Sequence, residues 1–256
     1  MSIAIITGAS SGIGKEFAKQ LHQNGEVDGF WFIARRKEVL EELRDELGVE
    51  AKVICADLTT EEGIDAYRHA LEEEKPEVSY LINSAGMGVF GSFDQLTEKQ
   101  VVSMLDLNIK ATVLLTHMTV PYMKKGGRII ELGSGSCFTP LPYFNIYSSS
   151  KVFVLHYTKS LNYELKPYAI RATCLCPGWV DTDLLVKLSK DKDRRHPKSF
   201  KPKLRVDYVV KKGLKAAKKG KTMCVINWYT KMQHVLFKLL PDSILSKIWL
   251  KMLTKS

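Results

Sequence analysis

Short apolar runs rich in β-branched residues alternate with longer amphipathic stretches along this chain. The apolar runs lie at 3–6, 30–33, 53–55, 80–82, 129–132, 172–175 and 223–226. The amphipathic stretches lie at 13–23, 37–47, 61–73, 98–124 and 147–166. Runs that are buried on both faces and that alternate with helices predict a parallel sheet covered on both sides. Because crossovers between parallel strands are right-handed, the expected fold is a doubly wound, Rossmann-type α/β sheet of about seven strands.

A further pattern near the C-terminus predicts two amphipathic helices over about 228–253. Apolar residues recur at helical spacing from Trp228 to Leu239, Pro241 interrupts them, and a second set runs from Ile244 to Met252 with lysines beside it. Packing on the protein body or on another subunit is the favoured role of these helices. A membrane-surface role is the less favoured alternative, since Lys and Trp are also typical of interfacial helices.

The composition of the 256 residues, 45% hydrophobic and 26% charged, is that of a globular protein, and we treat residues 1–256 as one domain. The net charge of +10 is concentrated, because residues 187–221 contain fifteen Lys or Arg and three Asp. A segment of this length predicts either a solvated surface loop or a basic substrate lid over about 184–221. Phe200 and Tyr208 are its only aromatic residues, so we expect no nucleic-acid partner.

The cysteine and histidine patterns favour reduced thiols and give no indication of a metal site. The five cysteines are an odd number and include no Cys-x-x-Cys pair, which favours reduced thiols over a disulfide framework. The first residues lack the pattern of a signal peptide, so a cytoplasmic location is expected. The six histidines have no metal-ligand spacing, and we expect no metal.

Candidate chemistry begins directly after the first apolar run, in the glycine-rich turn Thr7-Gly8-Ala9-Ser10-Ser11-Gly12-Ile13-Gly14. Glycines permit a tight turn there and let the backbone approach a pyrophosphate, which the positive end of the following helix attracts. The same residues fit the Gly-x-Ser-x-Gly elbow of α/β-hydrolases, but that mechanism needs an oxyanion donor from an earlier strand loop. Because only seven residues precede Gly8, the turn favours dinucleotide binding.

Two arginines, Arg35 and Arg36, follow the second apolar run about 20 residues after Gly14. An NAD-binding site places an acid near this point for the ribose 2′-hydroxyl, whereas a guanidinium matches the geometry of a 2′-phosphate. The pair therefore predicts NADP (NADPH) as the cofactor.

Tyr147 and Lys151 lie four residues apart, so on a helix they share one face. A free tyrosine has a pKa near 10 and is a poor acid or base at neutral pH. A neighbouring ammonium stabilises the phenolate and lowers that pKa, which would supply an acid/base group for an alcohol or a ketone. A Tyr-x-x-x-Lys motif is common by chance, so its weight depends on what accompanies it.

The accompanying motifs resemble those of the short-chain dehydrogenase/reductase family. In order, the chain has TGASSGIG at 7–14, Asn83-Ser84-Ala85-Gly86, Asn108, Ser134, Tyr147-x-x-x-Lys151 and Pro177-Gly178-Trp179-Val180-Asp181-Thr182. The resemblance covers residues 3 to about 183 and, taken jointly, is specific. The family usually reads Asn-Asn-Ala-Gly in the second motif, and we expect Ser84 to be tolerated there as a small polar replacement.

The resemblance implies a role for each of these residues. Tyr147 would be the acid/base, Lys151 would bond the nicotinamide ribose and lower the pKa of Tyr147, and Asn108 would hold a water that relays protons to Lys151. Ser134 would bond the substrate oxygen, with Ser136 as the alternative. The implied cofactor-binding residues are Gly8, Ser10, Ser11, Gly12, Ile13, Gly14, Arg35, Arg36, Asp57, Leu58, Asn83, Ala85, Gly86, Tyr147, Lys151, Pro177, Gly178, Val180 and Thr182, with Asp57 on the adenine amino group and Val180 and Thr182 at the carboxamide end.

The expected substrate is bulky and apolar, because aromatic residues surround the predicted catalytic positions. The candidate substrate contacts are Ser134, Ser136, Phe138, Tyr143, Phe144 and Trp179. We expect an NADP-dependent enzyme that interconverts a secondary alcohol and a ketone, and a bile-acid-type hydroxysteroid is the leading substrate because the basic segment could attract an anionic tail. A carbonyl reductase, a 3-oxoacyl reductase and a non-catalytic NADP-binding or membrane-surface module are the alternatives. The resemblance also implies a homodimer or homotetramer formed through residues 98–124 and 147–166.

Overall fold

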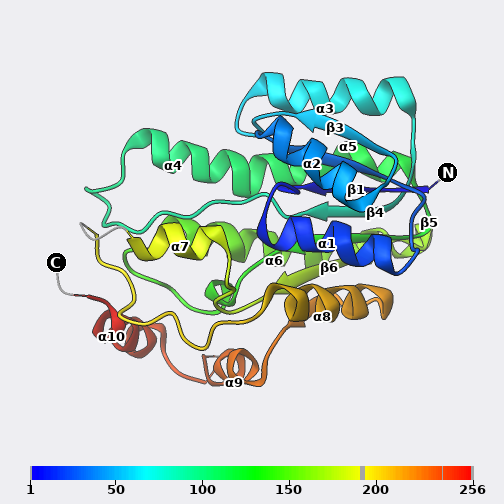
Figure 1. Ribbon diagram of the computed structural model, residues 1–256. Coiled ribbons are helices and arrows are strands. Elements are labelled where there is room, and N and C mark those ends of the chain that lie inside the picture. Colours follow the sequence, from blue (N-terminus) through cyan, green and yellow to red (C-terminus); the bar gives the residue numbers. More distant parts are fainter. Residues whose placement is uncertain (1, 191–193, 238, 255–256) are drawn as a thin grey trace.

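The computed structural model of the protein describes residues 2–190, 194–237 and 239–254. Its centre is one parallel sheet with the strand order β3-β2-β1-β4-β5-β6-β7 (Figure 1). The strands are β1 (Ser2–Thr7), β2 (Gly29–Ala34), β3 (Ala51–Cys55), β4 (Glu77–Asn83), β5 (Met123–Leu132), β6 (Arg171–Cys176) and β7 (Met223–Val225). Each predicted apolar run overlaps one of these strands, and the predicted doubly wound α/β fold is confirmed.

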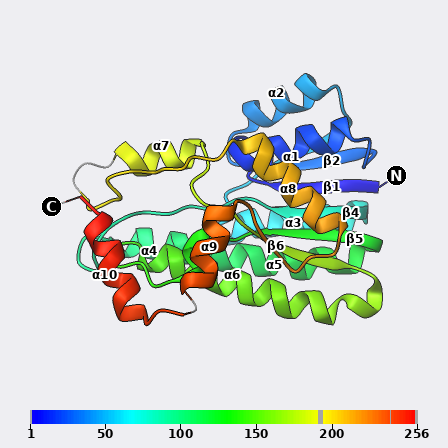
Figure 2. The ribbon, with the colours of Figure 1, turned by 90° about the horizontal axis from the view of Figure 1, so that it is seen from below.

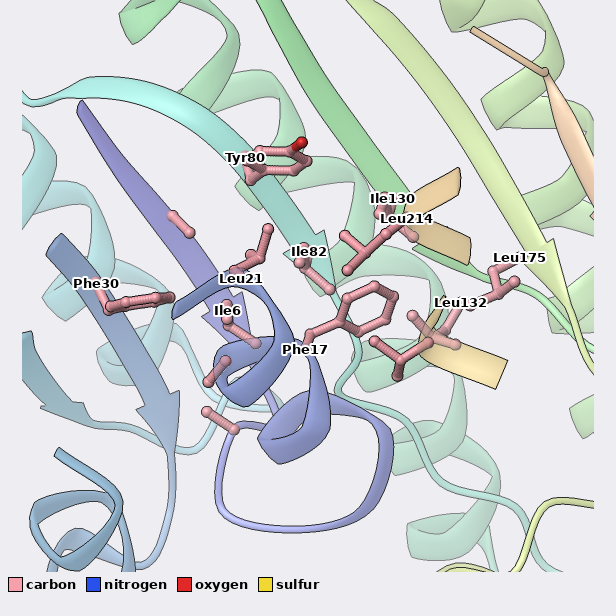
Figure 3. Packing of buried hydrophobic residues seen from close by; sticks show 14 of the residues in the cluster. Ile6, Phe17, Leu21, Phe30, Tyr80, Ile82, Ile130, Leu132, Leu175 and Leu214 are labelled. Carbon is pink, nitrogen blue, oxygen red and sulfur yellow. The ribbon is translucent and has the colours of Figure 1, made fainter. Parts of the chain in front are cut away.

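Helices cover both faces of the sheet (Figure 2). One face carries α1 (Gly12–Gln23), α2 (Lys37–Leu47) and α8 (Val206–Lys218), and the other carries α3 (Glu61–Glu74), α5 (Thr112–Thr119) and α6 (Asn145–Glu164). Figure 3 shows the core under the first face, where Phe17 and Leu21 of α1 meet Ile82, Leu132 and other side chains from the strands. Because side chains alternate across a strand, neighbouring apolar residues supply the two cores in turn.

The predicted helix over 98–124 is interrupted where it passes the candidate site. α4 (Glu98–Leu105) begins with a capping box between Thr97 and Gln100 and continues into a π-helical turn, η1 (Asp106–Ala111), and then into α5. π-Helical turns are frequent at functional sites, and this one carries Asn108. By length and composition the whole helical stretch could span a membrane, with a mean hydropathy of 1.2, but Ala111 and Leu115 are buried against the sheet.

The basic segment predicted as a single loop or lid has three different parts. α7 (Asp183–Lys190) follows β6, residues 194–205 run along the surface, and α8 packs against α1 and the sheet. Val209, Val210 and Leu214 of α8 are buried. α8 is therefore a core helix rather than part of a lid, since its apolar residues recur at helical spacing among the lysines. Residues 191–193 of the predicted lid lie outside the described residues.

Two helices, α9 (Trp228–Phe237) and α10 (Asp242–Met252), occupy the range predicted for amphipathic helices; Lys238 of this range lies outside the described residues. Figure 1 shows them at the edge of the molecule farthest from α3. Trp249 Nε1 donates a hydrogen bond of 2.8 Å to the carbonyl oxygen of Pro142. The backbone nitrogen of Lys198 donates one of 2.9 Å to the carbonyl oxygen of Met252. These bonds attach α10 to the loop before α6 and to the surface segment that follows α7.

Candidate active site

A pocket lies at the carboxyl ends of β1, β4, β5 and β6, where the strand order changes direction between β1 and β4. The register of the sheet sets Thr7 beside Asn83 and Asn83 beside Glu131. Of the predicted site residues, the pocket wall contains Ile13, Gly86, Ser134, Ser136, Phe144, Tyr147, Lys151, Pro177, Gly178, Trp179, Val180 and Thr182. The topology therefore gathers motifs that are up to about 170 residues apart in the sequence.

The glycine-rich turn has the shape that a pyrophosphate cradle needs. Gly8 has a φ of 66°, and a Cβ atom on it would lie 2.9 Å from the backbone nitrogen of Ala85. A Cβ atom on Gly14 would lie 2.4 Å from the carbonyl oxygen of Gly8. Ser11 is the N-cap of α1 and makes no side-chain hydrogen bond to its first turn. The N–H groups at the positive end of α1 are therefore left to a ligand, and the turn fits a dinucleotide.

The two predicted phosphate-binding arginines contact different residues. Arg36 Nη2 donates to Ser10 Oγ at 3.1 Å and so reaches across the mouth of the glycine-rich turn. Arg35 is largely exposed, and its Nη1 lies 3.8 Å from Asp57 Oδ2. Partial burial works against ionisation of Asp57, but hydrogen bonds from Thr59 and the charge of Arg35 hold the pKa of its carboxyl below the usual value. Asp57 is thus ionised and available to an amino group.

Tyr147 and Ser134, the predicted acid/base and its partner, both line the pocket. Ser134 follows β5 and caps the 3₁₀ turn η3 (Gly135–Phe138), and its Oγ accepts a hydrogen bond of 3.1 Å from Ser136 N. Burial raises the pKa of Tyr147 to about 12, and a hydrogen bond with Ser134 opposes that rise. The expectation that Lys151 lowers this pKa is not met, because burial dominates. Tyr147 is therefore a protonated phenol near neutral pH.

Lys151 lies one helical turn after Tyr147 and is buried with it. Its Nζ donates a hydrogen bond of 2.7 Å to the carbonyl oxygen of Leu132 and lies 5.7 Å from the centroid of the Tyr147 ring. Burial lowers the pKa of Lys151 to about 8, and the neighbouring acidic groups Cys174 and Glu131 oppose that shift. Desolvation thus makes the Lys151 ammonium easier to deprotonate than that of a free lysine, although it stays mostly protonated near neutral pH.

Asn108 is fully buried at the edge of the pocket. Its side chain makes two hydrogen bonds to the backbone of Met87 in the loop after β4. Nδ2 donates to the carbonyl oxygen of Met87 at 2.8 Å, and Oδ1 accepts from Met87 N at 3.0 Å. A Cβ atom on Gly86 would lie 3.3 Å from Asn108 Oδ1 and 3.4 Å from Lys151 Nζ. Gly86 therefore leaves open the gap between these two side chains, where the predicted water would lie.

Three cofactor-binding predictions fall on residues that support the site from the core. Asn83 Nδ2 donates to Thr116 Oγ1 at 2.9 Å and to Glu131 Oε1 at 3.0 Å. Leu58 is buried among the apolar side chains under α3, and Ala85 uses its backbone nitrogen to hold Thr7 Oγ1 at 3.0 Å. Asn83 and Leu58 therefore face the core, where they set the positions of the loops around the pocket.

Sequence reasoning missed Glu131, which is fully buried and whose carboxyl interacts with the charge of Lys151. Burial raises the pKa of its carboxyl to about 7, while hydrogen bonds from Asn83 and Thr116 and the charge of Lys151 oppose that rise. Its Oε2 makes no hydrogen bond to the described residues. An acid inside the apolar run of β5 was the available signal, since an unpaired buried charge is costly.

The predicted substrate contacts divide into two groups. Ser134, Ser136, Phe144 and Trp179 lie in the pocket wall, and Ser136 Oγ is buried without a hydrogen-bond partner among the described residues. Phe138 instead contacts His234 in a tilted ring pair with centroids 4.1 Å apart, and Tyr143 accepts a hydrogen bond of 2.9 Å from Arg195. These two side chains lie outside the pocket wall. Phe138 contacts α9, and Tyr143 contacts residues 194–205.

The outer pocket wall comes partly from α7, which lies in the predicted substrate lid, and partly from α10, for which the sequence predicted packing on the body or on another subunit. Leu184 and Leu188 of α7 and Leu245 and Trp249 of α10 line the pocket together with Trp179. Leu188 and Trp249 also share an apolar cluster with the ring of Phe144, which stacks on Tyr147 at 4.4 Å. A substrate oxygen at Tyr147 would therefore have apolar side chains around the rest of the molecule.

The family model described as short chain dehydrogenase matches residues 2–193. The chain belongs to this family. Among curated relatives, this short-chain dehydrogenase is 34% identical over 184 residues to an uncharacterized oxidoreductase of Staphylococcus epidermidis, covering 71% of this chain and 79% of that protein. It is 32% identical over 194 residues to the human inactive hydroxysteroid dehydrogenase-like protein 1, covering 71% of this chain and 56% of that protein.

Two solved structures extend the similarity over nearly the whole chain. A short-chain dehydrogenase from Sphingobium yanoikuyae in complex with NADPH has a TM-score of 0.78 and 27% identity, with 96% of each chain covered. A bulky-bulky ketone specific alcohol dehydrogenase from Comamonas testosteroni has a TM-score of 0.74 and 26% identity, with 93% of each chain covered. These matches place the present chain among the oxidoreductases of the family.

Proposed function

We propose that this short-chain dehydrogenase is an NADP-dependent oxidoreductase that interconverts a secondary alcohol and a ketone on a bulky, apolar substrate. The observation that carries the proposal is that Tyr147, Ser134 and Lys151 share one pocket whose outer wall is apolar. When bound, the nicotinamide would supply or accept the hydride. Tyr147 exchanges the proton at the substrate oxygen, and Ser134 donates a hydrogen bond to the same atom.

Ketone reduction is the direction that the site supports best. Burial keeps Tyr147 protonated near neutral pH, and the protonated phenol is the form that gives a proton to a carbonyl oxygen as it becomes an alcohol. Oxidation of an alcohol would need the phenolate, whose population rises only at high pH.

NADP is the cofactor that the charges favour. Arg36 lies over Ser10 of the glycine-rich turn and Arg35 lies beside Asp57, so two guanidinium groups lie close to where the ribose of the adenosine would be held. A guanidinium pairs with phosphate through parallel hydrogen bonds, which favours the cofactor that carries a 2′-phosphate. The similar structure from Sphingobium yanoikuyae holds NADPH.

A bile-acid-type hydroxysteroid, or its ketone, is the leading substrate. The wall formed by Leu184, Leu188, Leu245 and Trp249 suits a rigid hydrocarbon, and the exposed Lys201 at the outer wall suits a distal carboxylate. The similarity to a bulky-bulky ketone specific alcohol dehydrogenase supports a large ketone. A carbonyl reductase and a 3-oxoacyl reductase are the alternatives of the same class.

A non-catalytic NADP-binding or membrane-surface protein is the alternative of a different class, and one relative is named as inactive. Against it, the chain retains Asn108, Ser134, Tyr147 and Lys151 in one site. The experiment is a turnover panel with NADPH and with NADH, in which steroid ketones, a 3-oxoacyl thioester and a small ketone are compared. Fastest turnover of a steroid ketone with NADPH supports the proposal, preference for the thioester favours the oxoacyl alternative, and cofactor binding without any turnover overturns the catalytic assignment.

A further inference from the structure

We propose that the outer surface of α9 and α10 docks on a membrane that contains anionic lipids, and that the apolar substrate passes from the bilayer into the pocket. The passage of substrate rests on the proposed function, whereas the docking does not. The surface consists of the exposed side chains of residues 228–252, and we call it the C-terminal apolar face.

α9 presents its apolar side to solvent. Trp228, Met232, Val235 and Leu236, together with Leu239 in the turn that follows, are exposed and recur at helical spacing along one side. Trp228 and Leu239 are 73% and 75% exposed. The polar Thr230 is buried at 2% exposure. A helix on the surface of a soluble protein normally has the opposite arrangement, so this stripe calls for an apolar surrounding.

α10 continues the same surface. Ile244, Ile248 and Met252 follow one another at steps of four residues and are 43%, 48% and 44% exposed, whereas Leu245 and Trp249 on the other side are buried. In the part of the chain that the structure describes, eight of the seventeen exposed large hydrophobic side chains lie between residues 228 and 252. The two helices therefore form one concentrated patch rather than scattered surface residues.

The C-terminal apolar face is continuous with the pocket. Ile248 and Met252 belong to both, because they line the pocket and remain exposed. The exposed Lys201 and Pro202 complete this part of the rim. A lipid-like molecule that leaves a bilayer at Ile248 would thus meet the apolar wall without first crossing water.

The charges around the face suit anionic headgroups. Residues 228–252 contain four lysines and one aspartate, and Lys231, Lys247 and Lys251 are exposed. The neighbouring residues 194–203 contain five Lys or Arg and no acid, and they run beside α10, where Lys198 N is bonded to the carbonyl oxygen of Met252. Apolar side chains flanked by lysines are the arrangement of helices that lie in the interface of anionic membranes.

A second copy of this chain is the competing occupant, and the site argues against it. A subunit seated on Ile248 and Met252 would cover the part of the pocket rim that reaches the surface. It would also bring two lysine-rich surfaces together, because a symmetric interface pairs each patch with itself. A bilayer with anionic lipids would leave the pocket rim accessible to an apolar substrate and would pair the lysines with anionic headgroups.

The test is co-sedimentation of the full chain, without substrate, with vesicles of phosphatidylcholine alone and with vesicles that also contain phosphatidylglycerol. Wild-type protein is expected to bind the anionic vesicles, and added salt should weaken binding. The double variant Trp228→Ser/Leu239→Ser, which alters no pocket residue, should reduce the partition coefficient by about tenfold or more. The charge reversal Lys247→Glu/Lys251→Glu should reduce it by about tenfold or more as well.

Matched control variants distinguish docking through the C-terminal apolar face from non-specific vesicle binding. Tyr163 on α6 is 73% exposed, like Trp228, so Tyr163→Ser should not change binding. Lys211 and Lys215 are exposed at the same spacing on α8, so Lys211→Glu/Lys215→Glu should reduce binding far less than the α10 reversal. Equal binding to both vesicle types, or variants that bind like wild type, would overturn the proposal. So would light scattering that shows an oligomer which Trp228→Ser/Leu239→Ser dissociates. Vesicle binding without turnover of any soluble ketone would instead count against the proposed function alone.

Discussion

The ammonium group of Lys151 donates a hydrogen bond of 2.7 Å to the carbonyl oxygen of Leu132, two residues before Ser134. This bond joins α6, which carries Tyr147 and Lys151, to the strand that delivers Ser134. Because Lys151 and Leu132 both line the pocket, the bond holds the helix of Tyr147 against the strand that precedes Ser134 at the pocket wall. The positions of the predicted catalytic side chains are therefore set by the buried layer between α6 and β5, which also contains Glu131.

That buried layer predicts a pH-dependent stability. Burial raises the pKa of Glu131 from its ordinary value near 4.5 to about 7, so the folded chain keeps a proton that the unfolded chain releases between these values. The stability that this proton contributes is complete below the lower value and is lost as pH rises through the upper one. Glu131→Gln cannot ionise, so its stability should fall less over this range, by an amount on the order of 3 kcal/mol.

The measurement is chemical unfolding of wild type and Glu131→Gln at about pH 5 and about pH 8. Glu72→Gln, at an exposed position on α3, is the control and should follow the wild type. Parallel pH curves for wild type and Glu131→Gln would mean that Glu131 is ionised throughout the range.

The arginine pair predicts the cofactor preference. Arg36→Ala removes a guanidinium that lies over Ser10, and a hydrogen bond to a charged group contributes about 1.5–3 kcal/mol. The dissociation constant of NADP should therefore rise by roughly tenfold to a hundredfold, while that of NAD changes little. Both constants can be measured by calorimetry, with the adjacent exposed Lys37→Ala as the control. An unchanged ratio of the two dissociation constants would show that Arg36 does not bind the 2′-phosphate and would leave Arg35 as the candidate.

The apolar wall predicts selection by substrate size. Leu188→Trp places a larger side chain on the pocket side of α7, whereas Val186→Trp places the same group on its exposed side. Leu188→Trp should lower kcat/KM for a steroid ketone by about tenfold or more and leave a small cyclic ketone nearly unaffected. Val186→Trp should change neither. If both ketones suffer equally in Leu188→Trp, α7 does not bound the substrate.

Lys201 predicts a preference for an anionic tail. It is the exposed cation of the outer pocket wall, whereas Arg194 and Arg195 bond the carbonyl oxygen of Phe90 and the hydroxyl of Tyr143. Lys201→Gln should raise KM for a carboxylated steroid by about twofold to fivefold without changing KM for its neutral analogue. Added salt should reduce the difference in the wild type, since exposed charges are screened. Lys187→Gln, on α7 outside the pocket wall, is the matched control. Identical salt dependence of KM for the two substrates would contradict the predicted preference for an anionic tail.

The sequence predicted the sheet and the catalytic motifs because both are local patterns. The β-branched runs gave all seven strands, and the turn from Gly8 to Gly14 needs glycine whatever surrounds it. The apolar positions of α8 were hidden among its lysines, so the basic segment was assigned to one loop or lid. The position of Trp249 against Pro142 depends on a contact across 107 residues, which no local pattern contains.

The electrostatics of the site also had to come from the fold. A Tyr-x-x-x-Lys spacing predicts that Lys151 lowers the pKa of Tyr147, but both side chains are desolvated, and desolvation dominates each pKa. Glu131 stood in the sequence as one acid in an apolar strand, and its place beside Lys151 follows only from the packing of α6 on β5.

The measurement that tests the central claim most directly is NADPH oxidation with a steroid ketone by wild type and by Tyr147→Phe. The phenylalanine variant keeps the ring that stacks on Phe144 but has no proton to give. We predict that NADPH binds both proteins with similar dissociation constants and that kcat falls by about 10²–10⁴-fold in the variant. Near-normal turnover by Tyr147→Phe, or no turnover of any ketone by the wild type under conditions in which NADPH binds, would contradict the account.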